Sequence, residues 1–136
     1  MTTRTKGIHH LGLTVPDVNA ARVFFEEALG FKKVNEKPEY PAVFVSDGTV
    51  MLTLWQAEDP ATAIPFDRRR GIGLHHLALQ VESEAVLRDL HGALSQRADV
   101  RIEFGPEPLG AAPLRHMMLR IPGNIRLELV APAMKS

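Results

Sequence analysis

A nine-residue stretch, GIHHLGLTV at residues 7–15, returns later in the chain as GLHHLALQV at residues 73–81. Six of the nine positions are identical, and a His-His pair is among them. The two copies begin 66 residues apart, which is about half of the 136 residues. Self-similarity at a fixed distance is typical of a repeated structural unit. The sequence therefore predicts two copies of one module, each opening on a strand that carries histidines.

The segment after each copy predicts the same order of elements. Residues 16–31 (PDVNAARVFFEEALGF) and 83–97 (SEAVLRDLHGALSQR) space their apolar residues as a helix does, with Asp17 and Ser83 as N-caps and Gly30 as a stop. Short apolar or β-branched runs follow, joined by Asp-Gly and Pro-Gly-Asn turns that are typical of hairpins. Each half is therefore expected to form a strand, a helix and two or three antiparallel strands.

These modules are expected to form one domain over residues 1–136. Module one covers about residues 7–56, a linker about 57–72, and module two about 73–131; residues 105–113 (GPEPLGAAP) are expected to be a loop. A single helix covers only one face of a sheet, so two modules side by side predict an α+β fold with a curved, cupped mixed sheet. The helices would lie on the outer face, and the concave face would be inside.

Composition narrows the classes of function. Lys+Arg 16 balances Asp+Glu 16, which disfavours nucleic acid and anionic lipid as partners. The chain has no cysteine, which excludes disulfides and thiolate metal sites. No apolar signal core precedes the first strand and no run approaches about 18 apolar residues, so we expect a cytoplasmic protein without a membrane span.

Strand alternation predicts which side chains face the concavity. In the first copy Leu11, Leu13 and Val15 form the row toward the helices, which turns His10 inward. The same reasoning turns His76 inward in the second copy, and places His9 and His75 in structural or surface positions.

The last strand, IRLELV, adds a carboxylate to the inward face. Glu128 lies between two leucines, and an unpaired buried carboxylate costs several kcal/mol. It needs a partner: either His10, His76 and a metal ion, or a cation such as Arg120 or Arg126. Aligning the hairpin turns places Thr53 at the position equivalent to Glu128, and a threonine hydroxyl is a poor ligand. Two histidines and one carboxylate suit an open site for Fe2+, Mn2+, Zn2+ or Ni2+.

Further residues are candidates for contact with a substrate. His116 is a candidate general acid or base, with a structural or surface role as the alternative. Arg120 either clamps a substrate carboxylate or phosphate or pairs with Glu128. Met118 is expected to form part of an apolar wall for a ligand. Met51 and Trp55, which share a strand face with Thr53, are expected to form another, with core packing as the alternative for these two residues. The run at residues 68–70, RRR, is predicted to be a solvated stretch of the linker, with attraction of an anionic substrate tail as the alternative.

The chain resembles the vicinal oxygen chelate superfamily, which includes glyoxalase I, extradiol dioxygenases and bleomycin-resistance proteins. The resemblance covers residues 7–131 and rests on IHHLGLTV with Pro16-Asp17, FFEEALGF, LHHLALQV and PGNIRLELV. It implies paired βαβββ modules with metal ligands in the first and last strands of each, which match His10, His76 and Glu128. Thr53 stands where glyoxalase I has a glutamate. The resemblance is weak for substrate because one scaffold carries many reactions.

The expected function is a divalent-metal-dependent lyase or isomerase of the glyoxalase type, with Glu128 and His116 as catalytic residues. Its small substrate would chelate the metal through vicinal oxygens. The alternatives are an extradiol-type ring-cleaving dioxygenase and a metal-free drug-binding resistance protein. A homodimer is expected, with the site either within one chain or completed across the dimer.

Overall fold

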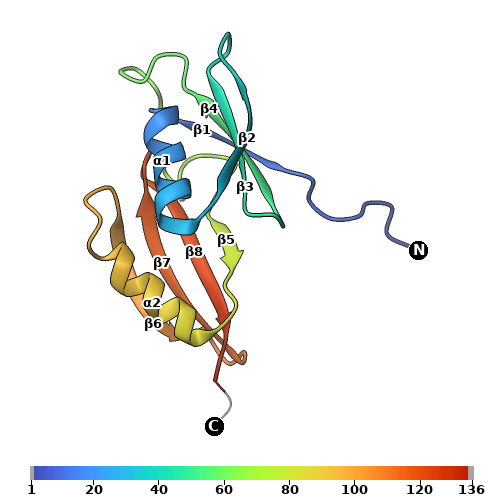
Figure 1. Ribbon diagram of the computed structural model, residues 1–136, viewed down its shortest axis with the longest axis vertical. Helices are drawn as coiled ribbons and strands as arrows, with labels where there is room; N and C mark the ends of the chain where they lie inside the picture. The colour runs from blue at the N-terminus through green and yellow to red at the C-terminus, as the bar shows by residue number, and fades with distance from the viewer. Residues whose placement is uncertain (1, 135–136) are drawn as a thin grey trace. The chain divides into compact units, whose positions relative to one another are not determined.

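The computed structural model describes residues 2–134 and divides the chain into two compact units, Met1–Ala63 and Ile64–Ser136. The boundary lies within the segment expected to be the linker. Unit 1 and unit 2 each contain a strand, a helix and three strands in that order (Figure 1). No helix in the described part of the chain is long and apolar enough to cross a membrane.

Unit 1 carries a four-stranded mixed sheet with helix α1 (Val18–Leu29) against it. The strand order is β1-β4-β3-β2; β1 runs parallel to β4, and the other neighbours are antiparallel. The strands are β1 (Leu11–Val15), β2 (Lys32–Lys37), β3 (Ala42–Ser46) and β4 (Met51–Gln56). The predicted cap residues of the helix are confirmed. The Asp17 side chain accepts hydrogen bonds from two backbone N–H groups, and Gly30 ends the helix with a φ of 75°.

Unit 2 repeats this arrangement around helix α2 (Glu84–Leu94), for which Ser83 is the N-cap as predicted. Its strand order is β5-β8-β7-β6, and β5 runs parallel to β8. The strands are β5 (Leu77–Gln80), β6 (Arg101–Pro108), β7 (Leu114–Ile121) and β8 (Ile125–Pro132). The expected α+β fold of two βαβββ modules is thereby confirmed, with a separate four-stranded sheet in each module.

Each helix covers one face of its own sheet, and the apolar rows of the strands fill the space between. In unit 2 the row beneath α2 is fully buried, with exposures of 0–1%: Met117, Leu119, Leu127 and Leu129. In unit 1 the buried strand residues beneath α1 include Leu52 and Leu54, and the helix contributes the buried residues Phe24 and Phe25. Because side chains alternate along a strand, Glu128 lies on the sheet face opposite α2.

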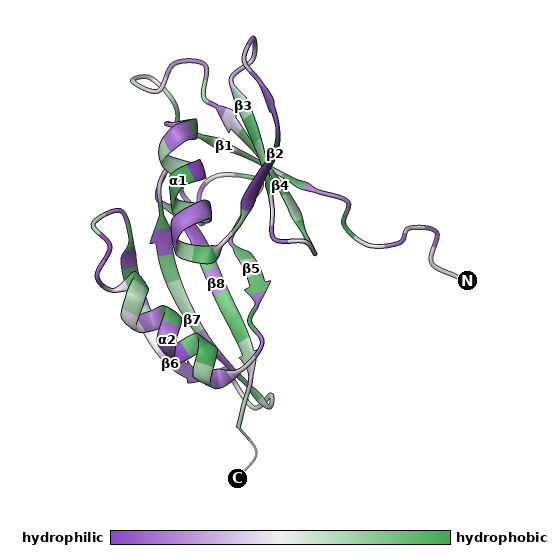
Figure 2. Ribbon diagram, viewed as in Figure 1, coloured by the Kyte–Doolittle hydropathy of each residue, from purple (hydrophilic) through white to green (hydrophobic). Residues whose placement is uncertain are grey.

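Two edge strands differ from what the apolar pattern suggests. Strand β2 (KKVNEK) is exposed along its whole length and hydrophilic (Figure 2); lysines on an edge strand discourage pairing with other chains. Strand β6 continues through Gly105–Pro108, so the expected loop at residues 105–113 is shortened to 109–113. An edge strand tolerates proline because one of its sides needs no N–H donor.

Strand pairing establishes which positions of the two units are equivalent. Gly12 of β1 pairs with Thr53 of β4, and Ala78 of β5 pairs with Glu128 of β8. Since Gly12 and Ala78 each follow the second histidine of a pair by two residues, Thr53 and Glu128 are equivalent, as the turn alignment predicts.

Candidate metal and acid–base site

The His-His pairs have the same geometry in both units. Each pair comes directly before the first strand of its unit, so that His10 precedes β1 and His76 precedes β5. The Nδ1 atoms of His9 and His10 are 2.9 Å apart, and those of His75 and His76 are 2.8 Å apart. One Nδ1 donates and the other accepts, which fixes the ring of the second histidine and leaves its Nε2 for another ligand.

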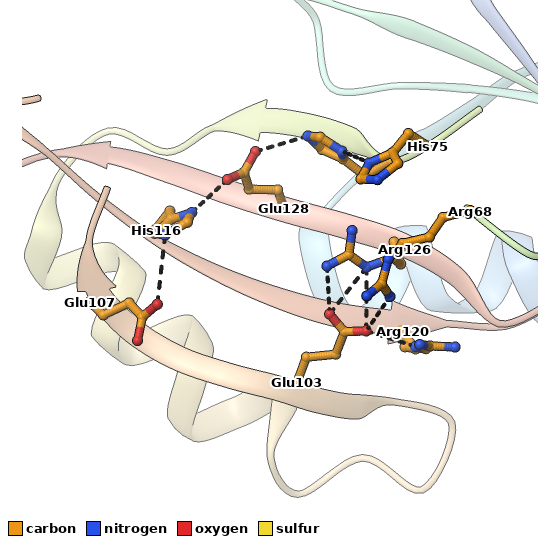
Figure 3. Close-up of polar contacts among 9 residues, drawn as sticks. Arg68, His75, Glu103, Glu107, His116, Arg120, Arg126 and Glu128 are labelled. Carbon is orange, nitrogen blue, oxygen red and sulfur yellow. Dashed lines mark hydrogen bonds and ion pairs between the residues drawn. The ribbon is translucent and has the colours of Figure 1, made fainter. Parts of the chain in front are cut away.

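Glu128 is held between two imidazoles in unit 2. Its Oε1 lies 3.3 Å from Nε2 of His76, and its Oε2 forms a 2.5 Å hydrogen bond with Nδ1 of His116 (Figure 3). Glu128 is only 8% exposed. A carboxylate this well buried needs such partners, because its desolvation is otherwise uncompensated. The partners of Glu128 are thus histidines.

His116 connects the buried carboxylate with the surface. Its Nδ1 faces Glu128, and its Nε2 lies 3.9 Å from Oε1 of Glu107, whose side chain is 53% exposed (Figure 3). The ring also makes an edge contact with Phe104, with centroids 5.0 Å apart. An imidazole with one nitrogen on a buried acid and the other toward a solvated carboxylate has the geometry of a proton relay.

The alternative in which Glu128 pairs with Arg120 or Arg126 is wrong. Both guanidinium groups bind Glu103 instead: Arg120 through Nε at 2.9 Å, and Arg126 through Nε at 3.1 Å and Nη2 at 2.8 Å (Figure 3). Register explains this choice. Arg120 and Arg126 pair with each other across β7 and β8, so both reach the bulge of β6 that carries Glu103.

Linker residues complete this charged region. Nη1 of Arg68 lies 3.4 Å from Oε1 of Glu103. Arg68 is therefore not fully solvated, although residues 68–70 were predicted to be a solvated stretch. A cavity of about 370 Å³, which we call the arginine pocket, is lined by Phe66, Asp67, Arg68, Arg69, Arg120 and Arg126.

The arginines shift the pKa values of their neighbours. Hydrogen bonding from Arg126, and then from Arg120, holds the pKa of Glu103 below its ordinary value although burial opposes this. The pKa of His75 is lowered by partial removal from water and then by the positive charges of His76, Arg126 and Arg68. Unit 2 therefore presents a positive region beside its histidine–carboxylate group.

The remaining predicted substrate contacts lie in unit 1 or beside Glu128. Met118 of β7 pairs directly with Glu128 in the sheet register and is 5% exposed. In unit 1, Thr53 is 2% exposed and accepts a 2.8 Å hydrogen bond from Nε1 of Trp55. Tyr40 packs edge-on against Trp55, with centroids 5.0 Å apart, and Met51 is half-buried on the same strand. These residues form an aromatic wall around a buried hydroxyl.

The structure brings together two of the three predicted metal ligands, His76 and Glu128, and adds His116. His10 belongs to unit 1. Imidazole nitrogen and carboxylate oxygen are the donors that Zn2+, Fe2+, Mn2+ and Ni2+ take, so the side chains fit such an ion chemically. Within residues 2–134 no three His, Asp or Glu side chains are already arranged to hold a metal; both oxygens of Glu128 face imidazoles instead.

Sequence reasoning missed Glu103 and Glu107. A signal for Glu103 was present: Arg120 and Arg126 flank the Pro-Gly-Asn turn symmetrically, so a hairpin puts them side by side on one face. Two adjacent guanidinium groups need a carboxylate, and the neighbouring strand VRIEF has only one. Glu107 was not predicted because residues 105–113 were expected to form a loop, whereas β6 continues to Pro108.

The sequence and the fold of this chain are similar to those of known proteins. The sequence model of the Glyoxalase/Bleomycin resistance protein/Dioxygenase superfamily matches residues 7–129. No curated protein sequence matches significantly. Among solved structures, a glyoxylase/bleomycin resistance protein/dioxygenase domain from Frankia sp. EAN1pec has a TM-score of 0.79 at 24% identity, covering 97% of this chain and 96% of that one.

Two further structures share the fold at lower identity. Lactoylglutathione lyase from Agrobacterium tumefaciens has a TM-score of 0.72 at 16% identity, covering 95% and 96% of the two chains. The fosfomycin resistance protein FosX from Listeria monocytogenes has a TM-score of 0.68 at 18% identity, covering 96% of each. The duplicated module, its register and the match over nearly the whole sequence lead to one conclusion: the chain belongs to the glyoxalase/bleomycin resistance protein/dioxygenase superfamily.

Proposed function

We propose that this protein is a metal-dependent lyase or isomerase of the glyoxalase type, acting on a small substrate that chelates through vicinal oxygens. The observation that carries the proposal is the buried Glu128 held between the imidazoles of His76 and His116. Such a carboxylate–imidazole pair is suited to taking a proton from one atom and delivering it to another. Members of the superfamily commonly use a divalent metal ion, act on small molecules and form dimers.

In this proposal His10, His76 and Glu128 hold the ion, which is Fe2+, Mn2+, Zn2+ or Ni2+. The Nδ1–Nδ1 contacts with His9 and His75 leave the Nε2 atoms of His10 and His76 as the donors. When bound, the ion acts as a Lewis acid that polarises a substrate oxygen. The protein is proposed to be a cytoplasmic homodimer, with His10 coming from the same chain or from the partner chain.

The proton chemistry falls to Glu128 and His116. Glu128 takes a proton from a substrate carbon next to a carbonyl group, and His116 holds a proton at Nδ1 against Oε2. Returning this proton to the former carbonyl carbon, while the proton of the neighbouring hydroxyl group moves to the former carbonyl oxygen, completes the isomerisation of an α-hydroxycarbonyl substrate. The Nε2 side of His116, near Glu107, allows exchange of the proton with solvent. Met118 beside Glu128 and the wall of Met51, Thr53 and Trp55 are proposed to exclude water from the substrate.

Metal binding by Glu128 is tested with Glu128→Gln and with Glu82→Gln as a matched control, since Glu82 is an exposed glutamate of the same unit. Elemental analysis after incubation with Fe2+, Mn2+, Ni2+ and Zn2+ gives the stoichiometry, and competition with a chelator gives the affinity. We expect Glu128→Gln to weaken binding by more than tenfold and Glu82→Gln to leave it unchanged. Equal affinity in both variants would remove Glu128 from the ligand set.

The reaction class is tested with the metal-loaded protein in D2O. We expect α-hydroxycarbonyl compounds to exchange the hydrogen next to the carbonyl for deuterium, as followed by NMR, without uptake of oxygen. Oxygen consumption with catechols would instead establish the ring-cleaving dioxygenase. Absence of metal binding together with tight binding of a drug such as bleomycin would establish a resistance protein that acts by sequestration.

A further inference from the structure

The arginine pocket lies outside the histidine–carboxylate group and has no role in the proton chemistry above. Its volume is about 370 Å³, and four of its six lining residues are arginines: Arg68, Arg69, Arg120 and Arg126. Two come from the loop before β5, and one each from β7 and β8. All belong to unit 2.

The charges of this pocket do not balance. The arginines contribute four positive charges, and the only carboxylates that line or contact the pocket in the described residues are Asp67 and Glu103. An excess of two positive charges remains. Arg68, Arg120 and Arg126 share the single carboxylate of Glu103, and Arg126 is only 7% exposed. A group of partly buried charges without full compensation is unfavourable. An anion in the pocket would lower that cost.

The guanidinium groups also have donors to spare. Each carries five N–H donors, and Glu103 uses only Nε of Arg120, Nε and Nη2 of Arg126, and Nη1 of Arg68. Both terminal nitrogens of Arg120 and Nη1 of Arg126 have no hydrogen-bond partner within residues 2–134. Glu103 therefore orients three arginines while leaving several donors for a ligand, which reduces the entropy that the ligand must offset.

We propose that the arginine pocket binds an anionic oxygen group, a carboxylate or a phosphate, carried by the substrate. Arginine is suited to both groups because its donors match two oxygens at once. Arg126 and Glu128 are two residues apart on one face of β8, a spacing of about 7 Å. For the site proposed above, the pocket thus selects small substrates that carry an anionic group in addition to the chelating oxygens; this assignment of substrate class rests on the proposed function.

The test measures anion binding in metal-free protein, so that it does not depend on turnover. Titration with inorganic phosphate and with succinate, at low and constant ionic strength, is followed by calorimetry and by NMR shifts of the arginine side chains. We compare Arg120→Gln and Arg68→Gln with Arg70→Gln, which removes an exposed charge next to the pocket but outside its lining. Thermal unfolding of each variant shows that it is folded, and Arg120→Lys keeps the charge but loses the paired donors.

We expect millimolar or tighter affinity that falls at least tenfold in Arg120→Gln and in Arg68→Gln, falls in Arg120→Lys, and is unchanged in Arg70→Gln. Preference for phosphate or for succinate then distinguishes a phosphorylated from a carboxylated substrate. Absence of binding, or an equal loss in Arg70→Gln, would overturn the proposal. Glu128→Gln should bind the anion normally, so failure of the metal site and failure of the anion site give different results.

Discussion

Two glutamates of unit 2 have partners of different chemical kinds. Glu128 contacts the imidazoles of His76 and His116, and an imidazole ring has one nitrogen that can donate a proton and one that can accept it. Glu103 contacts arginines, which stay charged at any working pH. The first arrangement suits proton transfer, whereas the second suits a permanent positive field. This contrast underlies the separate roles proposed for the two regions.

His116→Gln tests the proton relay. Glutamine can still donate a hydrogen bond to Glu128 but cannot carry the proton onward. We expect deuterium exchange to slow by about 10²- to 10⁴-fold while metal affinity changes little. His91→Gln, a histidine of α2 that does not contact Glu128, is the control and should leave exchange unchanged. A parallel loss of metal binding in His116→Gln would instead make His116 a ligand.

Glu103→Gln tests the ionic contribution to stability. The pKa of Glu103 is lowered in the folded state, first by the hydrogen bond from Arg126. A lowered pKa means stabilisation that is present above the unfolded value of about 4.3 and is lost as pH falls through the folded value. The variant should be less stable by about 3 kcal/mol at pH 7, and the difference should shrink from about pH 5 downward.

Urea unfolding between pH 3 and pH 7 measures this difference, with Glu82→Gln as the exposed control. A gap between wild type and Glu103→Gln that is constant over the whole range would show that the ion pairs contribute nothing pH-dependent to folding.

At the scale of elements, short local signals set the ends of the helices. Asp17 accepts hydrogen bonds from the N–H groups of Asn19 and Ala20, at 3.0 and 3.1 Å. Ser83 accepts one from Val86 at 3.2 Å. These contacts satisfy N–H donors in the first turn that have no partner within the helix. Helix α1 therefore begins shortly after β1 ends, and helix α2 shortly after β5 ends.

Asp17→Ala should destabilise the protein by about 1 kcal/mol, because two N–H groups at the start of α1 lose their acceptor. Thermal or urea unfolding measures the change. Asp89→Ala, an exposed position of α2, should change stability by less than about 0.5 kcal/mol. Equal effects of the two substitutions would mean that the capping bonds are replaced by water at no cost.

The hairpin of β7 and β8 is the element that positions both charged regions. Its register sets Met118 opposite Glu128 and Arg120 opposite Arg126 on the face away from α2. A shift by one residue would turn every one of these side chains toward the apolar core under the helix. The buried row of Met117, Leu119 and Leu127 prevents that shift, so the same residues that stabilise the core also align the site.

At the scale of the whole molecule, the proposed ligands come from both units: His10 from unit 1, and His76 and Glu128 from unit 2. A homodimer with a two-fold axis can supply them from two chains. If His10 comes from the partner chain, we expect that mixing His10→Ala with Glu128→Gln restores metal binding and deuterium exchange to about a quarter of the wild-type level. Random exchange makes half of the dimers mixed, and each mixed dimer has one complete site.

The mixture is compared with each variant unmixed, and gel filtration checks that dimers form and exchange. Recovery would place the site across the dimer. No recovery, with metal binding lost in each variant, would place all three ligands in one chain. Full metal binding by His10→Ala would show that unit 1 supplies no ligand.

Much of the fold follows from the sequence because its signals are local. The repeated HH strand, the caps Asp17 and Ser83 and the hairpin turns each act within a few residues, and alternation assigns Leu127 and Glu128 to opposite faces without knowledge of other strands. The equivalence of Thr53 and Glu128 follows from the repeat in the same way. Edge strands such as β2 were not identified individually, since an exposed strand has no apolar row to reveal it.

The partners of the charged side chains were decided only by the tertiary structure. Arg68 lies 35 residues before Glu103, and Glu103 and Arg126 are 23 residues apart, so no local rule pairs them. The bulge of β6 and the register of β7 with β8 bring Glu103 to the arginines and leave Glu128 to His76 and His116. The sequence by itself determined which residues face the same side of the sheet, because the period of a strand is intrinsic to its backbone. Which carboxylate pairs with which histidine or arginine depended on how separate strands align. An ion pair or hydrogen bond forms only when two groups come within a few ångströms, and these groups lie on segments far apart in the chain.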